Sequence, residues 1–305
     1  GVFNITDPES GHVAIAEDTY VIKWDKKGLG ISNVTLEYST DSGSTWSYVN
    51  PSGDHSVPNV GVDNASYSWS VPGDVLSSFC KLKMRDLNNA YANDTGAGFF
   101  AIRGQIEVTM PDGGESWQVG SNHTINWTKK GNISTVEIAY SYNNGTNWTV
   151  LAPAVNASDL GWPWDISTNL STSTTARVKV TDNGNPSNVF NLSNGTFEVK
   201  GSVSLTAPTN EGIVLTYDNA SSTNITWNKY GGISNVRIKY SVNNGSTYPN
   251  TIINSTGADS SPYPWPIPDS IGTQLRVNVS DIDNPTVYST SNNSFAIKGS
   301  VNLIA

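Results

Sequence analysis

The chain has 305 residues, a formal net charge of −9 and a pI of about 4.7. This acidity argues against nucleic acid or an anionic membrane surface as a partner. Hydrophobic residues make up 36% of the sequence and include ten Trp, which is too many for a disordered chain. Only 14% of the residues are charged, so we expect a neutral surface of hydroxyl and amide groups, as is common outside the cell.

One signature occurs four times along the chain. Its copies begin at Gly1, Gly104, Gly201 and Gly299, and each continues as a short strand. A spacing of about 100 residues corresponds to one domain per repeat. The sequence therefore predicts module 1 (residues 1–103), module 2 (104–200) and module 3 (201–298). Residues 299–305 then form either the start of a fourth module or a strand donated to a neighbouring subunit.

Each module contains the same series of segments in which apolar and polar residues alternate. The apolar members in module 1 are Tyr20, Ile22, Trp24, Val34, Leu36, Tyr38, Trp46, Trp69, Leu82, Met84, Phe100 and Ile102. Their counterparts begin at Ile125 and Trp127 in module 2 and at Ile225 and Trp227 in module 3. Alternation indicates strands with one buried face. About seven strands in roughly 100 residues predict an all-β chain of three tandem immunoglobulin-like sandwiches.

The modules follow one another without a spacer. Phe100, Ile102, Gly104, Ile106 and Val108 keep one parity across the first boundary, and the second boundary repeats this pattern. A flexible array would carry a Ser-, Gly- or Pro-rich linker at these positions. We therefore expect a linker-less rod in which the last strand of one module continues into the first strand of the next.

The only cysteine is Cys80, so no disulfide can form within the chain and packing alone must hold each sandwich. Cys80 is either a small buried hydrophobe or a free thiol. His123 has the parity of a core residue and is expected to pack inside module 2. No set of nucleophile, base and acid clusters or repeats, so the sequence predicts no catalytic residues and no enzyme.

An eight-residue pattern recurs once in each module. Residues 39–46 read Ser-Thr-Asp-Ser-Gly-Ser-Thr-Trp, and residues 141–148 and 241–248 are variants of them. The pattern resembles the Asp-box of sialidases, where it is structural. Asp or Asn can accept backbone hydrogen bonds and Gly can take a positive φ, so we expect a hairpin turn.

A second signature begins at Pro111 and reads Pro-Asp-Gly-Gly-Glu-Ser-Trp-Gln-Val-Gly, followed by Thr124-Ile125-Asn126-Trp127. It resembles the immunoglobulin-like domain first noted in Kre9/Knh1-type cell-wall proteins and found in tandem on microbial surface proteins. The resemblance is specific in module 2, because module 1 lacks the Trp and module 3 has three extra residues before Trp227. It implies association with a cell surface or wall and no catalysis.

Asn-x-Ser/Thr sequons are more frequent than the composition alone would give. The candidates for N-glycosylation are Asn4, Asn33, Asn64, Asn93, Asn122, Asn126, Asn132, Asn144, Asn147, Asn156, Asn169, Asn191, Asn194, Asn219, Asn224, Asn244, Asn254, Asn278 and Asn292. One alternative is that outward strand positions favour Asn, Ser and Thr. The other, which we favour, is that some of these residues carry covalent N-glycans.

Two further patterns suggest ligands. The equivalent loops 182–186 and 281–285 make Asp182, Asp281 and Asp283 candidate Ca²⁺ ligands, although such turns use Asp in any case. No other cofactor is expected. Trp162 and Tyr263 each stand two residues before a core Trp, and they form either a sugar-stacking platform or a hydrophobic plug.

These observations lead to two hypotheses of function. The first is a non-enzymatic, N-glycosylated extracellular protein that self-associates as a repeat segment of a surface layer, sheath, filament or stalk. The second is an adhesin, or carbohydrate-binding accessory modules of a larger surface protein or secreted hydrolase. No apolar run is long enough to span a bilayer, so no membrane insertion is expected in this segment.

Overall fold

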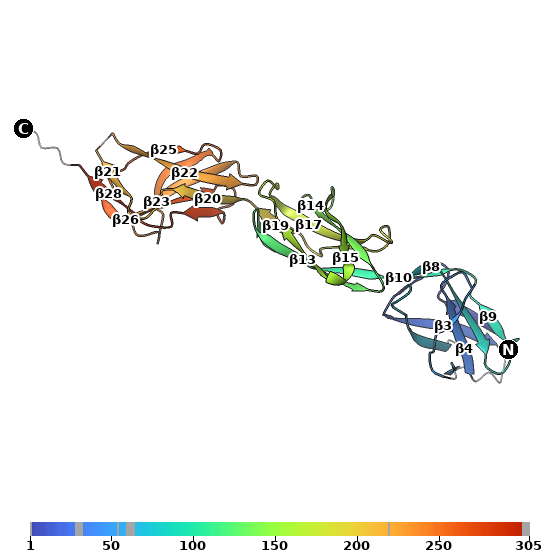
Figure 1. Ribbon diagram of the computed structural model, residues 1–305. Coiled ribbons are helices and arrows are strands. Elements are labelled where there is room, and N and C mark those ends of the chain that lie inside the picture. Colours follow the sequence, from blue (N-terminus) through green and yellow to red (C-terminus); the bar gives the residue numbers. More distant parts are fainter. Residues whose placement is uncertain (1, 28–32, 54, 59–64, 219, 301–305) are drawn as a thin grey trace, which may run out of the picture.

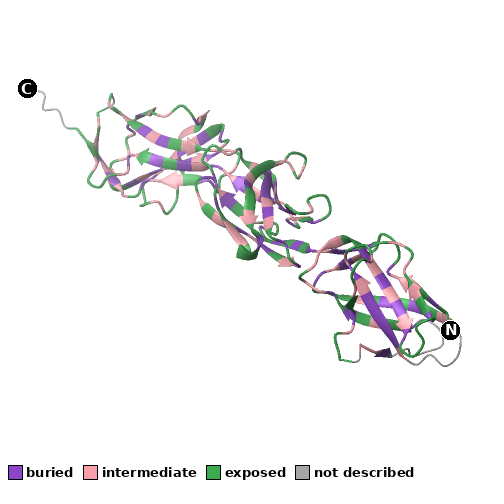
Figure 2. Ribbon diagram, turned by 45° about the vertical axis from the view of Figure 1, so that its right-hand side comes forward, coloured by how far each residue is buried: buried purple, intermediate pink, exposed green. Residues whose placement is uncertain are grey.

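The computed structural model describes residues 2–27, 33–53, 55–58, 65–218 and 220–300. It consists of three pairs of β-sheets that lie end to end, with strand β3 in the pair at one end and strand β28 in the pair at the other (Figure 1). The buried residues form three separate groups, one inside each pair of sheets (Figure 2). The chain is therefore an elongated array of three sandwiches with separate cores.

Module 2 shows the common architecture. Its strands are β11 (Gln105–Met110), β12 (Ser116–Gln118), β13 (Asn122–Lys130), β14 (Thr135–Ser141), β15 (Thr149–Asn156), β16 (Gly161–Asp165), β17 (Ser173–Asp182), β18 (Phe190–Leu192) and β19 (Phe197–Lys200), with the 3-10 helix η1 at Ala157–Asp159. One sheet has the order β11-β13-β16, and the other has the order β12-β19-β17-β14-β15 with β18 beside β17. Strand β12 runs parallel to β19. Two packed sheets with this strand order make an immunoglobulin-like sandwich.

Modules 1 and 3 repeat this topology. Module 1 contains β1 (Val2–Asp7), β2 (Val13–Ile15), β3 (Thr19–Lys27), β4 (Asn33–Ser39), β5 (Ser47–Tyr48), β6 (Val57–Pro58), β7 (Ala65–Ser70), β8 (Ser77–Asp86), β9 (Asn93–Thr95) and β10 (Phe100–Arg103). Module 3 contains β20 (Ser202–Ala207), β21 (Val214–Tyr217), β22 (Ser222–Tyr230), β23 (Asn235–Ser241), β24 (Asn250–Gly257), β25 (Tyr263–Pro266), β26 (Gly272–Asp281), β27 (Tyr288–Thr290) and β28 (Phe295–Gly299). The fold class predicted from the alternating pattern is confirmed.

Tryptophan fills the centre of each sandwich. Trp127 on β13 is 2% exposed, and its indole Nε1 donates to the carbonyl of Ala157 at 3.1 Å. Trp227 repeats this contact with the carbonyl of Ala258 at 2.9 Å. A buried indole N–H needs such an acceptor, so these bonds let a large ring occupy the core without loss of polar contact. Ring packing therefore holds the two sheets together without a disulfide.

The single cysteine belongs to the core. Cys80 on β8 has no exposed surface, and burial raises the pKa of its thiol. A thiol that is buried and protonated is a poor nucleophile. Of the two alternatives left open by the sequence, the structure supports the small buried hydrophobe.

The junctions between modules consist of one residue each. Strand β10 ends at Arg103 and β11 begins at Gln105, with Gly104 between them. Strand β19 ends at Lys200 and β20 begins at Ser202, with Gly201 between them. The linker-less succession of strands predicted from parity is confirmed. Residues 301–305 lie outside the described residues, so a fourth repeat or a donated strand stays a prediction.

The burial of Cys80 can be tested by thiol labelling. We expect the thiol to react with a disulfide reagent only when module 1 unfolds, because the folded sandwich excludes solvent from it. The matched control is Ser78→Cys in a Cys80→Ala background, since Ser78 lies two residues away on β8 and is exposed. This control should react at once in the folded protein. Rapid labelling of native Cys80 would contradict the packing described here.

Candidate functional site

The two joints have the same geometry, and a close backbone approach defines it. A Cβ added at Gly104 would lie 2.8 Å from Ile133 Cδ1 and 2.9 Å from the carbonyl oxygen of Lys130. A Cβ added at Gly201 would lie 2.6 Å from Ile233 Cγ1. Real Cβ atoms do not approach other atoms so closely, so only glycine lets the following module seat its isoleucine against the junction.

A second glycine at each joint contacts the preceding module. Gly131 lies between β13 and β14 with a φ of 79°, and a Cβ there would be 2.9 Å from Ala16 Cβ and 3.0 Å from Leu76 Cδ2. Gly231 takes the equivalent place in module 3, with a φ of 75°. The loop between β13 and β14 therefore packs against the end of module 1, and the loop between β22 and β23 packs against the end of module 2.

Polar contacts also cross the joints. The backbone N–H of Gly231 donates to the carbonyl of Thr168 at 2.8 Å. Lys130 Nζ lies 2.9 Å from Asp18 Oδ2 at the first joint, and Asn284 Nδ2 donates to Glu198 Oε1 at 2.8 Å at the second. An exposed ion pair contributes little, typically below about 1 kcal/mol. The close approach of Gly131 to Ala16 and Leu76, and the equivalent approach of Gly231 to Val119, are therefore the main contacts across the joints, and the polar contacts add to them.

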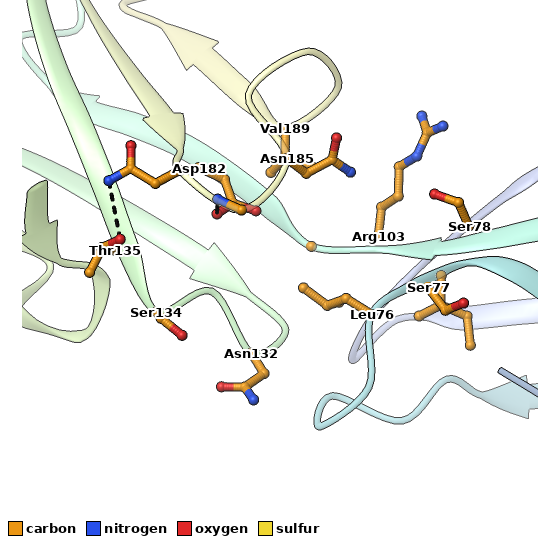
Figure 3. A pocket seen from close by; sticks show the side chains of 14 residues that line it. Leu76, Ser77, Ser78, Arg103, Asn132, Ser134, Thr135, Asp182, Asn185 and Val189 are labelled. Atoms are coloured by element: carbon orange, nitrogen blue, oxygen red, sulfur yellow. Dashed lines mark hydrogen bonds between the residues drawn. The ribbon is translucent and has the colours of Figure 1, made fainter. Parts of the chain in front are cut away.

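Each joint leaves an open cleft beside the glycines. The first has a volume of about 630 Å³, with Leu76 and Arg103 on the side of module 1 and Asp182 and Asn185 on the side of module 2 (Figure 3). The second has a volume of about 540 Å³ and is lined in part by Glu198, Asp281, Asp283 and Asn284. The three candidate Ca²⁺ ligands predicted from the sequence thus lie at the joints.

Asp182 and Asp281 have a clear role in turns. Asp182 Oδ1 accepts the N–H of Gly184 at 2.8 Å, and Asp281 Oδ1 accepts the N–H of Asp283 at 3.0 Å. Asp86 makes the same bond to the N–H of Asn88 at 3.0 Å. Among the described residues, no three His, Cys, Asp or Glu side chains form a group that could hold a metal ion. Binding of Ca²⁺ stays a prediction, while the turn accounts for these carboxylates in all three modules.

The eight-residue pattern forms the predicted hairpin turn. In module 1 the N–H of Gly43 donates to Ser39 Oγ at 2.7 Å, and the N–H of Thr45 donates to Asp41 Oδ1 at 2.8 Å. The same bonds recur around Ser141 and Asn143, and around Ser241 and Asn243. The pattern therefore joins β4 to β5, β14 to β15 and β23 to β24.

The aromatic residue at the end of this turn lies outside the core. Trp46 Nε1 donates to the carbonyl of Gly43 at 3.0 Å, and Lys83 Nζ lies 4.3 Å from the centre of the Trp46 ring. Lys179 lies over Trp148 in the same way at 5.0 Å. These rings cover the turn on the outer face of the larger sheet, where a cation stabilises them.

The second signature forms the crossover between the two sheets of module 2. The carboxylate of Glu115 accepts the backbone N–H groups of Asp112 at 2.6 Å and Gly113 at 2.9 Å. Trp117 is buried, and its ring stacks on His123 at 4.4 Å. Burial lowers the pKa of His123, so the ring is neutral and packs against the core as predicted.

The predicted sequons differ in exposure. The Asn residue is exposed at Asn4, Asn93, Asn122, Asn132, Asn144, Asn147, Asn156, Asn169, Asn194, Asn224, Asn244, Asn254 and Asn292. It is half-buried at Asn33, Asn126, Asn191 and Asn278. Asn64 and Asn219 lie outside the described residues. Six of the thirteen exposed Asn residues lie in strands and seven lie in loops or turns, so the strand pleat accounts for only part of this exposure.

Trp162 and Tyr263 lie at the rim of the cores. Trp162 pairs with Ile125 and Tyr263 pairs with Ile225, and both are half-buried against core residues. Directly paired residues share one face of a sheet, so both rings are on the core side. This position leaves only part of each ring for a sugar.

One set of structural residues was not found from the sequence. The first strand of each module has an irregular register, and the N–H at this point donates to a side chain of the opposite sheet. The acceptors are Asp94 for Ile5, Asn191 for Val108 and Ser289 for Leu205, at 2.8, 2.9 and 3.0 Å. The acceptor is Asp in one module, Asn in another and Ser in the third, so no common residue type identifies this position in the sequence. Only the fold reveals that they close the sandwich edge.

Comparison with known proteins gives similarity in structure alone. No protein-family model matches the chain, and no curated protein matches it significantly in sequence. The N-terminal four immunoglobulin domains of Dscam1 are similar over 98% of this chain and 73% of that chain, at 11% identity and a TM-score of 0.33. A tetra-tandem repeat of a large adhesion protein is similar over 96% and 73%, at 15% identity and a TM-score of 0.35. An I-band fragment of titin is similar over 99% of both chains, at 7% identity and a TM-score of 0.32.

The assignment as immunoglobulin-like rests on the strand order of each module and not on these similarities. Within the described ranges, no helix is long and apolar enough to cross a membrane.

The joint packing predicts the effect of Gly201→Ala. The added methyl group would collide with Ile233, and overpacking of this kind costs about 1–3 kcal/mol. We expect loss of hydrogen-exchange protection at the Gly231 N–H, which bonds to Thr168 across the joint. Gly53→Ala is the matched control, because a Cβ at that position has open space. Unchanged protection at Gly231 in the Gly201→Ala variant would show that the junction does not depend on the glycine.

The hairpin predicts a pH dependence for module 1. Hydrogen bonds from the side chain and backbone of Thr45 and from Ser39 lower the pKa of Asp41 to about 2. The ionised carboxylate therefore stabilises the fold at neutral pH, and this contribution is lost as the pH falls from about 4 to about 2.

Asp41→Asn should retain the turn, because modules 2 and 3 have Asn at this position, and should weaken the acid dependence between pH 4 and pH 2. Thermal unfolding of both proteins across this range measures the difference. Identical acid dependence in the two proteins would be incompatible with the assigned role of Asp41.

Proposed function

We propose that the chain is a non-enzymatic extracellular structural protein, a repeat segment of a surface layer, sheath, filament or stalk. The observation that carries this proposal is the joint, which occurs twice with the same glycine and isoleucine packing. A protein whose role is to set distance and direction needs joints that are short and closely packed, because inter-domain motion is the default for domains on flexible linkers.

Association with further copies or other surface components follows from this role. A rod of this kind connects two components, one at each end, so it is expected to function within a larger assembly. The aromatic cores also give each module stability without disulfides, since Cys80 is the only cysteine. Self-association is part of the proposal, and imaging of the native assembly tests it.

N-glycosylation is the second part of the proposal. Its support is the exposure of thirteen of the sequon Asn residues, including Asn122 and Asn224 on the outer sides of β13 and β22. A glycan at such a position extends into solvent and does not disturb the core.

Glycopeptide mass spectrometry of the native protein tests this part. We expect glycans at members of the exposed set and none at Asn33, Asn126, Asn191 and Asn278, which are half-buried. A native protein without any N-glycan would remove this part of the proposal and leave the structural role standing. Glycans confined to the half-buried set would contradict the use of exposure as the criterion.

The alternative function is an adhesin or a carbohydrate-binding accessory module. Its support is the partial exposure of Trp162 and Tyr263, because aromatic rings stack on sugars. Trp162→Ala should then reduce glycan binding by about tenfold, as expected for loss of an aromatic contact of about 1.5 kcal/mol. Tyr142→Ala is a suitable control, since Tyr142 is an exposed aromatic residue elsewhere on module 2. A glycan array without any signal would remove this alternative.

A further inference from the structure

Module 3 has a groove on the outer face of its larger sheet that the rod function does not use. The groove has a volume of about 370 Å³. Its lining comprises Arg237, Lys239, Tyr248, Asn278, Ser280, Pro285 and Tyr288. The volume lies at the lower end of the range for small-ligand sites, which is about 300–1,000 Å³. The lining is basic, although the whole chain carries a net charge of −9.

The equivalent face of module 1 balances its charges. Glu37 on β4 is paired across the strands with Lys83 on β8, and it forms ion pairs with both Lys83 and Arg85. In module 2 the same row of β14 holds Glu137 and Ala139, opposite Thr181 and Lys179. Each of these faces therefore contains an acid for its cations.

Module 3 departs from this arrangement. Arg237 stands opposite Ser280, and Lys239 stands opposite Asn278. The lining contains two cations and no carboxylate. Among the described residues, the ion pairs involve neither Arg237 nor Lys239. Two cations close together on one sheet face repel each other, and an anion bound between them would offset this repulsion.

The guanidinium of Arg237 also lacks a partner where it is buried. Its Nε atom is inaccessible to solvent and has no hydrogen-bond acceptor in the part of the chain that the structure describes. Buried donors in native proteins nearly always have an acceptor. Arg276 on the same face differs, because its Nε donates to Asn244 Oδ1 at 2.9 Å. The face therefore has an unused donor next to an uncompensated charge.

Two tyrosines add aromatic surface to the groove. Tyr288 is 59% exposed, and Tyr248 is half-buried at the end of the hairpin turn. The side chain of Tyr288 occupies a strand position that is Asn93 in module 1 and Phe190 in module 2. Tyrosine presents a ring for stacking and a hydroxyl for hydrogen bonding, which suits the mixed surface of a sugar.

We propose that this groove binds an acidic saccharide, with the carboxylate of a uronic-acid residue held between Arg237 and Lys239 and its ring against Tyr288. Arginine forms two parallel hydrogen bonds to a carboxylate, and lysine adds a point charge. This site lies on the larger sheet of module 3. The groove includes neither the joint residues nor Trp162, so a negative result at this site would leave the proposed rod function unaffected.

The position of Asn278 provides an additional test of the groove. Asn278 belongs to a sequon and lines the groove between the strand positions of Lys239 and Thr290. A glycan attached there would fill the groove, so the site requires Asn278 to be unmodified. Detection of an N-glycan at Asn278 in the native protein would overturn the proposal.

Calorimetric titration of the full chain with a galacturonic-acid tetrasaccharide tests the site, with maltotetraose as the uncharged comparison. We expect saturable binding of the acidic probe only, weakened by added salt because the contact is ionic. Arg237→Thr introduces the residue of module 1 at this position (Thr35) and Lys239→Ala introduces the residue of module 2 (Ala139), so the fold should be retained. This double variant should bind the acidic tetrasaccharide at least about tenfold more weakly, because hydrogen bonds between charged groups are stronger than those between neutral groups.

Lys179→Ala is the matched control, because Lys179 is a cation at the position of Asn278 in module 2. It should leave binding unchanged. Tyr288→Ala removes the ring and should weaken binding of the uronate sugar more than binding of a glutamate tetrapeptide. Equal binding of maltotetraose, equal binding by the double variant, or absence of saturable binding would each overturn the proposal.

The uronate could belong to a free polysaccharide or to a glycan on a neighbouring copy. Dissociation of the native assembly by the tetrasaccharide would support the second source. Binding of the tetrasaccharide without any effect on the assembly would support the first.

Discussion

The close approach of backbone at Gly104 and Gly201 is the constraint on which the shape of this molecule depends. Each glycine lets an isoleucine of the following module, Ile133 or Ile233, lie where a Cβ would otherwise be. A second glycine, Gly131 or Gly231, then lets the loop between β13 and β14, or between β22 and β23, pack against the preceding sandwich. The strand therefore passes from one core to the next within one residue, and the relative orientation of the modules follows from packing and not from a linker.

The rest of each module supports this arrangement. Buried tryptophans with satisfied indole N–H groups hold the sheets together, so no disulfide is needed at the centre of the sandwich. The hairpin turns leave the outer face of the larger sheet free for side chains of varied charge. Modules 1 and 2 place an acid among the cations of that face, while module 3 has Arg237 and Lys239 without one. One scaffold thus provides both the length of a rod and a face that can differ between repeats.

Alternation predicted the strands, the single-residue junctions and the packed His123, because burial on one face of a strand imposes a period of two. The hairpin was predictable because each residue type has a known role in such a turn. Asp or Asn accepts backbone hydrogen bonds, and Gly takes a positive φ. The clefts at the joints, the acceptors Asp94, Asn191 and Ser289, and the basic groove were not. These features bring together residues from separate strands, and their letters differ between modules, so only the register of the folded sheets reveals them.

Small-angle X-ray scattering of the whole chain in solution tests the central claim most directly. Three sandwiches in line should give a maximum dimension of about 110 Å, from strand length and rise, with a scattering profile that one rigid rod fits. A profile that only a broad set of bent shapes can fit would contradict the account, because it would mean that the glycine and isoleucine contacts do not fix the joints.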